Sequence, residues 1–111
     1  MSKLKELFKN KSTDLCSVFF TSGFPELSDT TKIIEGLSKN GVDFIEVGMP
    51  YSDPLADGLT IQESSSRALA KGINLDIIFD QLKSIKNSNN TPLVLMGYLN
   101  QMLRYGEHKF C

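Results

Sequence analysis

Cysteine is scarce in this sequence, histidine occurs once, and no apolar run approaches the roughly 20 residues that a membrane-spanning helix needs. The two cysteines, Cys16 and Cys111, lack the Cys-x-x-Cys or Cys/His spacing of a metal site, so we expect reduced thiols that bind no metal. Lysines interrupt the apolar residues of segment 2–11, which therefore lacks the continuous apolar core of a signal peptide. These absences predict a cytoplasmic protein that does not span a membrane.

An excess of charge of one sign is also missing. The 12 lysines and arginines nearly balance the 13 aspartates and glutamates, for a net charge of −1. Hydrophobic residues make up 41% of the chain and charged residues 23%, which is typical of a folded domain and not of a disordered segment. A nearly neutral chain has no electrostatic attraction to nucleic acid or to an anionic membrane, so neither is an expected partner.

Three short stretches have the nearly continuous apolar character of buried parallel strands: residues 15–20, 43–47 and 92–96. Amphipathic patterns typical of helices lie around them. These cover residues 3–8, 29–39, 60–70 and 74–85, with a further helix that opens near residue 100. Strands that alternate with amphipathic helices pair in parallel through right-handed crossovers. The sequence therefore predicts an α/β fold with βαβαβα order, a pattern shared by flavodoxin-like sheets and (β/α) barrels.

Capping signals mark the starts of several of these helices. Ser28 or Asp29 can cap the second helix, and Asn74 can cap the fourth. Thr60 and Glu63 have the spacing of a capping box, in which each side chain binds a backbone N–H at the start of the helix. We therefore expect the helices to begin at these residues.

The second strand contains a candidate catalytic acid. Period-two alternation places Phe44, Glu46 and Gly48 on one face of the sheet and Ile45 and Val47 on the other. The apolar pair suits a face covered by helices, which turns Glu46 toward a barrel interior, near the strand ends where barrel enzymes keep their active sites. An acid partly removed from water there can exchange protons near neutral pH. On strand geometry alone, a structural glutamate paired with a lysine or arginine is an equal alternative.

A turn-rich loop follows this strand and contributes two further carboxylates. Pro54 holds Asp53 extended, and Asp57-Gly58 supplies a tight turn. Loop aspartates are usually turn formers, yet an acid in a strand followed by a carboxylate in the next loop also suggests a two-carboxylate active site. Glu46, Asp53 and Asp57 could instead offer oxygen ligands to Mg²⁺.

The stretch from Asp43 to Gly58, continued by Thr60, Ile61 and Gln62, resembles the strand-2 and loop-2 signature of the tryptophan synthase alpha chain family. The resemblance implies a (β/α)8 TIM barrel and a lyase of tryptophan biosynthesis, which cleaves indole-3-glycerol phosphate by a retro-aldol reaction into indole and glyceraldehyde 3-phosphate. A complete barrel typically needs about 250 residues. Residues 1–111 are therefore expected to be the N-terminal part of a single barrel domain, with strands one to three and the start of helix three.

The resemblance also implies roles for five residues. Glu46 matches the catalytic glutamate and is expected to shuttle protons. Asp57 matches the second catalytic carboxylate, which accepts a hydrogen bond from the indole N–H and stabilises positive charge on the ring. Phe19 and Tyr98 match aromatic residues of the indole pocket, although strand aromatics more often belong to the core. Asp53 is expected to contact the partner. The family's cleavage needs no metal, so the Mg²⁺ alternative is not expected.

The implied partner is the tryptophan synthase beta chain, which binds pyridoxal phosphate and receives the indole. No cofactor is expected in this chain itself. Phosphate-binding loops of such barrels commonly follow strands seven and eight, so we expect the 111 residues alone to be inactive. Two other functions stay open: a non-catalytic module that binds or modulates the beta chain, and another phosphate-substrate barrel enzyme, such as an isomerase.

The sequence departs from the family pattern at two loop positions. Leu59 stands where proline usually follows Asp-Gly, and Gln101 stands where proline usually follows Tyr-x-Asn. The run Ser64-Ser65-Ser66 invites comparison with a nucleophile, but it has no glycine elbow or neighbouring base. We therefore expect these serines on a helix surface. Both departures are expected in loops, and both candidate acids are still present in the sequence.

Overall fold

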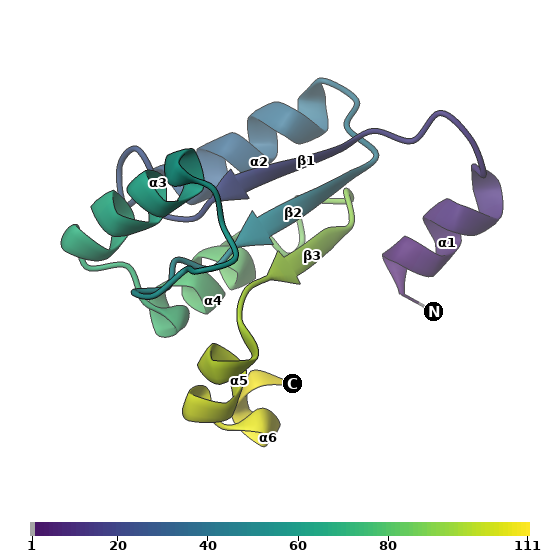
Figure 1. Cartoon of the computed structure of the whole chain (residues 1–111). Helices are drawn as coiled ribbons and strands as arrows, with labels where there is room; N and C mark the ends of the chain where they lie inside the picture. The colour runs from purple at the N-terminus through teal and green to yellow at the C-terminus, as the bar shows by residue number, and fades with distance from the viewer. Residues whose placement is uncertain (1) are drawn as a thin grey trace.

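The computed structural model describes residues 2–111, in which three parallel strands form one sheet in the order β1-β2-β3 (Figure 1). The strands are β1 (Ser17–Thr21), β2 (Phe44–Gly48) and β3 (Leu93–Met96). The helices are α1 (Lys3–Asn10), α2 (Asp29–Lys39), α3 (Leu59–Ala70), α4 (Leu75–Ser84), α5 (Leu99–Tyr105) and α6 (Glu107–Phe110). The predicted alternation of strands and helices is confirmed, with α3 and α4 both inserted between β2 and β3.

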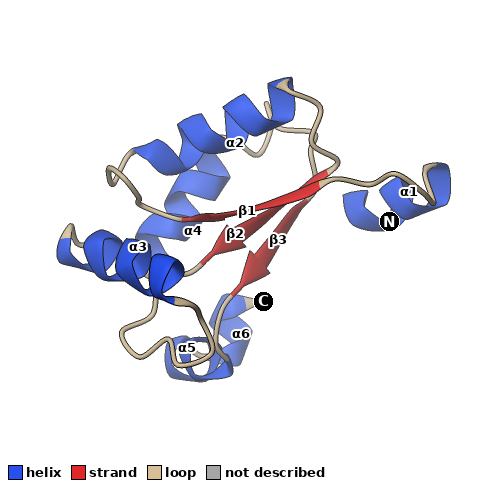
Figure 2. Cartoon of the chain, turned by 45° about the horizontal axis from the view of Figure 1, so that its top comes forward, coloured by secondary structure: helices blue, strands red, loops and turns tan. Residues whose placement is uncertain are grey.

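The two faces of the sheet have different surroundings. Ile45 and Val47 are fully buried on the face that α2 and α4 cover, where they pack with Ile34 of α2 (Figure 2). On the opposite face Glu46 is only partly buried, and Met96 is 51% exposed. The predicted alternation along the second strand is therefore correct, and the face that carries Glu46 is the more open one.

The first strand begins later than the apolar pattern predicts. Leu15 and Cys16 precede β1, and the Cys16 side chain is exposed. The Cys16 N–H donates to a carboxylate oxygen of Asp43 at 2.7 Å, and Lys11 Nζ lies 3.0 Å from the other oxygen. These contacts, the Cys16 hydrogen bond above all, lower the pKa of Asp43. An ionised Asp43 thus joins the starts of β1 and β2, and its own backbone N–H donates to the Cys16 carbonyl at 2.9 Å.

The C-terminal segment forms two short helices in place of the expected single helix. Gly106 lies between α5 and α6 with a φ of +98°, a conformation that side chains rarely adopt. The change of direction there brings Phe110 back against Phe79 of α4, with the ring centroids 5.5 Å apart. Glycine conformation and aromatic packing together end α5 at Tyr105.

The N-termini of α2 and α4 are capped in different ways. Asn74 caps α4, because its side-chain oxygen accepts from the Ile77 N–H at 2.9 Å. Ser28 occupies the N-cap position of α2 but makes no side-chain cap hydrogen bond. The Asp29 carboxylate instead accepts from the Glu26 N–H at 3.1 Å, in the turn before α2.

The predicted capping box at the start of α3 is wrong. The helix begins at Leu59 with Gly58 at the N-cap, which leaves Thr60 inside the first turn. Glu63 forms an ion pair with Arg67 one turn later, at 2.6 Å, and is not available to the backbone. Capping-box spacing without the matching start residue is therefore not enough to position a helix.

None of the helices within residues 2–111 has the length and apolar character needed to cross a membrane.

Candidate functional site

A cavity of about 340 Å³ lies at the carboxyl ends of the three strands. Its walls come from all three strand ends, the loop after β2 and helix α3. They include Phe19, Gly48, Asp57, Ile61, Ser65 and Tyr98. Three of the five residues expected at the site, Phe19, Asp57 and Tyr98, thus border one cavity although they are far apart in the sequence.

Asp57 and Tyr98 form a direct hydrogen bond at the edge of this cavity. The Tyr98 hydroxyl donates to Asp57 Oδ2 at 3.1 Å, and the Ala56 N–H donates to the same hydroxyl at 3.1 Å. Burial raises the pKa of Tyr98, and the neighbouring Asp57 carboxylate raises it further, so the phenol stays protonated at neutral pH. Asp57 therefore accepts from a neutral donor. Within residues 2–111 its Oδ1 has no protein hydrogen bond, which leaves an acceptor for a donor group in the cavity.

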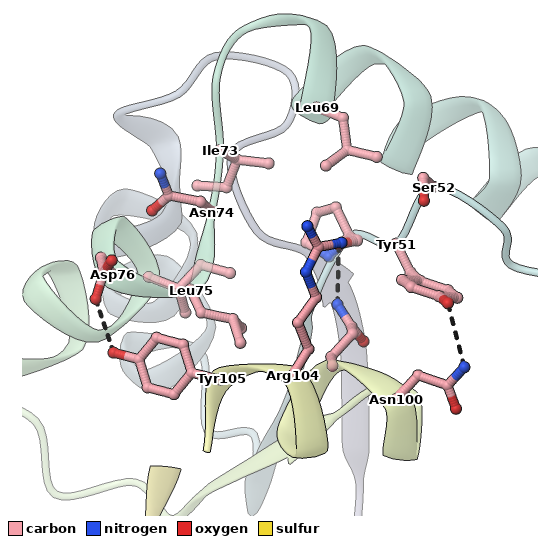
Figure 3. Close-up of a pocket in the computed structure, with 13 residues that line it drawn as sticks. Tyr51, Ser52, Leu69, Ile73, Asn74, Leu75, Asp76, Asn100, Arg104 and Tyr105 are labelled. Carbon is pink, nitrogen blue, oxygen red and sulfur yellow. Dashed lines mark hydrogen bonds between the residues drawn. The ribbon is translucent and has the colours of Figure 1, made fainter. Parts of the chain in front are cut away.

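A second aromatic ring supports Tyr98 from outside this cavity. Tyr51 stacks on Tyr98 with ring centroids 5.0 Å apart, and Asn100 Nδ2 donates to the Tyr51 hydroxyl at 3.4 Å. Tyr51 also borders a larger cavity of about 610 Å³, into which the side chain of Arg104 points (Figure 3). The Tyr51–Tyr98 pair therefore separates the two cavities, and it restricts the position of the Tyr98 ring.

Glu46 lies beside the first cavity and does not line it. Its Oε1 accepts from Ser17 Oγ at 3.1 Å, at the start of β1. The Cα of Glu46 is the register partner of Phe19, which does line the cavity. The structure thus brings Phe19, Asp57 and Tyr98 together and places Glu46 next to them with its carboxylate bound to Ser17.

The Phe19 ring can reach the cavity wall because residue 48 is glycine. A Cβ at Gly48 would lie 2.5 Å from Cζ of Phe19 and 2.8 Å from the Phe20 carbonyl oxygen. Both distances are far below van der Waals contact, so no larger residue fits without movement of the ring and of the β1 backbone. A glycine inside a strand is a general sign of close approach. This sign was present in the sequence but could not identify Phe19 as the partner.

Two serines are buried at or beside the cavity where the sequence predicted a helix surface, and of these Ser65 lines it. Ser64 and Ser65 are buried, whereas Ser66 is exposed. Ser64 Oγ lies 2.7 Å from Thr21 Oγ1, so α3 is hydrogen-bonded to the end of β1. The surface prediction is therefore wrong for two of the three serines, because α3 lies across the end of β1 (Figure 2).

Asp53 is apart from the cavity, on the exposed part of the loop after β2. Its neighbour Leu55 is 82% exposed, and Leu59 at the start of α3 is also exposed. Within residues 2–111, no group of three or more His, Cys, Asp and Glu side chains is arranged to hold a metal ion. The geometry therefore gives no support to a Mg²⁺ site formed by Glu46, Asp53 and Asp57.

Comparison with known proteins identifies the family. The model of the tryptophan synthase alpha chain family matches residues 4–111. The chain belongs to the tryptophan synthase alpha chain family. The alpha chain of Flavobacterium johnsoniae is 55% identical over 97 residues, which are 87% of this chain and 38% of the relative. The alpha chain of Phocaeicola vulgatus is 47% identical over 111 residues, which are 100% of this chain and 43% of the relative.

Solved structures of the family have the same fold over this segment. Tryptophan synthase subunit alpha from Legionella pneumophila superposes with a TM-score of 0.88 at 34% identity, covering 96% of this chain and 42% of that one. Tryptophan synthase from M. tuberculosis, in an aminoacrylate-bound form, gives 0.89 at 30% identity, covering 99% and 46%. The chain spans about two fifths of the length of its relatives. The predicted fold class, an N-terminal βαβαβα portion of a (β/α)8 barrel, is confirmed.

The segment can be studied within a complete barrel by replacing the matching part of the Phocaeicola vulgatus alpha chain with residues 1–111, because that match covers the whole segment. We call this protein the chimera. In the alpha chain family the enzyme needs no cofactor of its own, and pyridoxal phosphate belongs to the beta chain. No cofactor therefore has to be added to the chimera.

Gly48→Ala in the chimera is expected to lower the free energy of unfolding by about 1–3 kcal/mol, the usual cost of overpacking. The added Cβ would displace the Phe19 ring and strain the backbone at Phe20. Urea unfolding followed by circular dichroism measures the change. Gly36→Ala is the matched control, since a Cβ there meets nothing within 4 Å and alanine favours the helix. Equal stability of the two variants would contradict the close contact between Gly48 and Phe19.

Proposed function

We propose that a protein carrying this segment within a complete barrel cleaves indole-3-glycerol phosphate to indole and glyceraldehyde 3-phosphate. The main observation in support is the Asp57 carboxylate, which Tyr98 holds at the edge of a cavity lined by Phe19. An aromatic cavity with one charged acceptor suits a flat apolar ring that carries a single N–H donor. We further propose that residues 1–111 are the N-terminal part of a single barrel domain.

In the proposed reaction Asp57 accepts a hydrogen bond from the indole N–H, and Phe19 and Tyr98 flank the ring. Cleavage requires that C3 of the indole gain a proton while the hydroxyl on the adjoining glycerol carbon loses one. The bond between C3 and that carbon then breaks, and the carbon becomes the aldehyde of glyceraldehyde 3-phosphate. Protonated C3 leaves positive charge on the ring, which the negative Asp57 stabilises.

Glu46 is proposed to transfer these protons. Glu46 is the one carboxylate in β2. Its partner on the neighbouring strand β1 is Phe19, which lines the cavity. To reach the substrate its side chain must turn away from Ser17, whose hydroxyl now donates to it. A single exposed hydrogen bond opposes that rotation, so its cost is modest.

We propose the tryptophan synthase beta chain as the partner, with pyridoxal phosphate bound there. Asp53, Leu55 and Leu59 are all exposed, on the loop after β2 and at the start of α3. Large apolar side chains exposed on a loop are suited to contact with a partner. The cytoplasm stays the predicted location of the complex.

The assay that tests the proposal follows indole release from indole-3-glycerol phosphate by the chimera, with and without the beta chain. Turnover at the level of the unaltered Phocaeicola vulgatus alpha chain is the expected result. An inactive but folded chimera that still stimulates the beta chain would instead support the non-catalytic module. Absence of both effects in a folded chimera would overturn the proposed function.

A further inference from the structure

Gln101 makes three hydrogen bonds from a buried position in the first turn of α5. It is 9% exposed. Its Nε2 donates to the carbonyl oxygens of Met49 and Pro50, at 3.3 and 3.0 Å, and its Oε1 accepts from the Tyr98 N–H at 2.9 Å. Each of its polar atoms therefore has a partner, and the amide connects the chain after β2 with the N-terminus of α5.

The surroundings leave this amide little freedom. A Cβ at Gly97 would lie 2.6 Å from Gln101 Oε1 and 2.4 Å from Cε of Met49, so both side chains pack directly on the Gly97 backbone. A buried amide in such a place stabilises one arrangement, because any rotation of the amide leaves a buried carbonyl or N–H without its partner. The Gln101 amide thus links the Tyr98 backbone directly to the backbone of Met49 and Pro50.

Tyr98 connects Gln101 to Asp57 through hydrogen bonds at both ends of the residue. Its backbone N–H is held by Gln101, its ring stacks on Tyr51, and its hydroxyl donates to Asp57. A tyrosine side chain has two main rotatable bonds, so a fixed backbone and a stacked ring together determine where the hydroxyl lies. A shift of the Tyr98 backbone would therefore move the donor that orients the Asp57 carboxylate.

We propose that Gln101 is a positioning residue for Asp57, acting through Tyr98; the catalytic part of this inference rests on the proposed lyase function. Gln101 does not touch the cavity that would hold the substrate. Small misplacements of a catalytic group can cost up to about 10²-fold in rate. Loss of the Gln101 amide is therefore expected to lower kcat for indole release, with a smaller effect on KM, since the charge on Asp57 matters most in the transition state.

The test compares Gln101→Met with Gln81→Met in the chimera. Both substitutions keep the length of the side chain and remove its hydrogen bonds. Gln81 is a partly buried glutamine of α4 that donates to the Leu27 carbonyl at 2.7 Å, outside the site. Gln101→Met should lower kcat by about 10- to 100-fold, whereas Gln81→Met should leave kcat at the parental level. Equal kcat values for the two variants would overturn the proposal.

A double-mutant cycle with Tyr98→Phe separates positioning from general loosening. If Gln101 acts through Tyr98, Gln101→Met combined with Tyr98→Phe should lose no more kcat than the more damaging single change. Multiplication of the two losses would mean that Gln101 acts by another route and would overturn the proposal.

Hydrogen exchange tests the positioning without any need for activity. The Ala56 N–H donates to the Tyr98 hydroxyl, so Gln101→Met should speed exchange in the peptide covering residues 51–58, and Gln81→Met should not. If the parental chimera fails to release indole, the proposed function falls, yet the exchange comparison still decides whether Gln101 positions the loop. Unchanged exchange in Gln101→Met would refute the positioning role.

Discussion

Glu46→Gln in the chimera should reduce indole release by about 10²–10⁴-fold, the usual contribution of general acid–base catalysis. The amide keeps the shape of the side chain and can still accept from the Ser17 hydroxyl, so the fold around β2 is expected to be preserved. It can no longer transfer a proton. KM for indole-3-glycerol phosphate should change much less than kcat, because the lost interaction belongs to the transition state.

Glu35→Gln is the matched control for this change. Glu35 is an exposed glutamate of α2, on the helical side of the sheet, so its substitution makes the same change of charge far from the cavity. Parental turnover is expected for the control. Near-normal turnover of Glu46→Gln would show that Glu46 takes no part in the mechanism. A purely structural role for Glu46 would then be the better interpretation.

Asp57→Asn should lower kcat by about 10²–10³-fold, comparable to removal of one charge-stabilising group in other active sites. The asparagine oxygen can accept from either the indole N–H or the Tyr98 hydroxyl, so substrate binding is expected to weaken less than turnover. The missing element is the negative charge that opposes positive charge on the protonated ring. Steady-state kinetics of indole release, with separate kcat and KM values, measure the difference.

Asp53→Asn provides the comparison for Asp57→Asn, since it makes the same substitution four residues earlier in the same loop. Asp53 is exposed and outside the cavity. Its substitution should therefore leave indole release by the chimera unchanged when the beta chain is absent. It should reduce the increase in indole release that the beta chain causes. The reverse pattern would show that Asp57 is an interface residue. The division of roles between the two aspartates would then be wrong.

The local residue pattern was sufficient to predict the order of the helices and strands and which face of each strand is buried. The alternation along β2, with Ile45 and Val47 buried beneath helices, follows from the period of two in a strand, which needs no knowledge of the partners. The Asn74 cap is also local, because its hydrogen bond spans three residues. Where local rules compete, as at Thr60 or at the helix break after Tyr105, sequence reasoning placed boundaries wrongly.

The sequence by itself thus determined the α/β order, the family and the identity of the candidate acids. Only the tertiary structure decided which side chains meet. The Tyr98 hydroxyl bonds Asp57 across 41 positions, and Gln101 reaches Pro50 across 51. Such contacts depend on strand register, on the path of the crossover helices and on the space that a glycine leaves, as at Gly48. These properties belong to the packed chain, because hydrogen bonds and steric contacts act over a few ångströms and carry no trace in the spacing of the residues that make them.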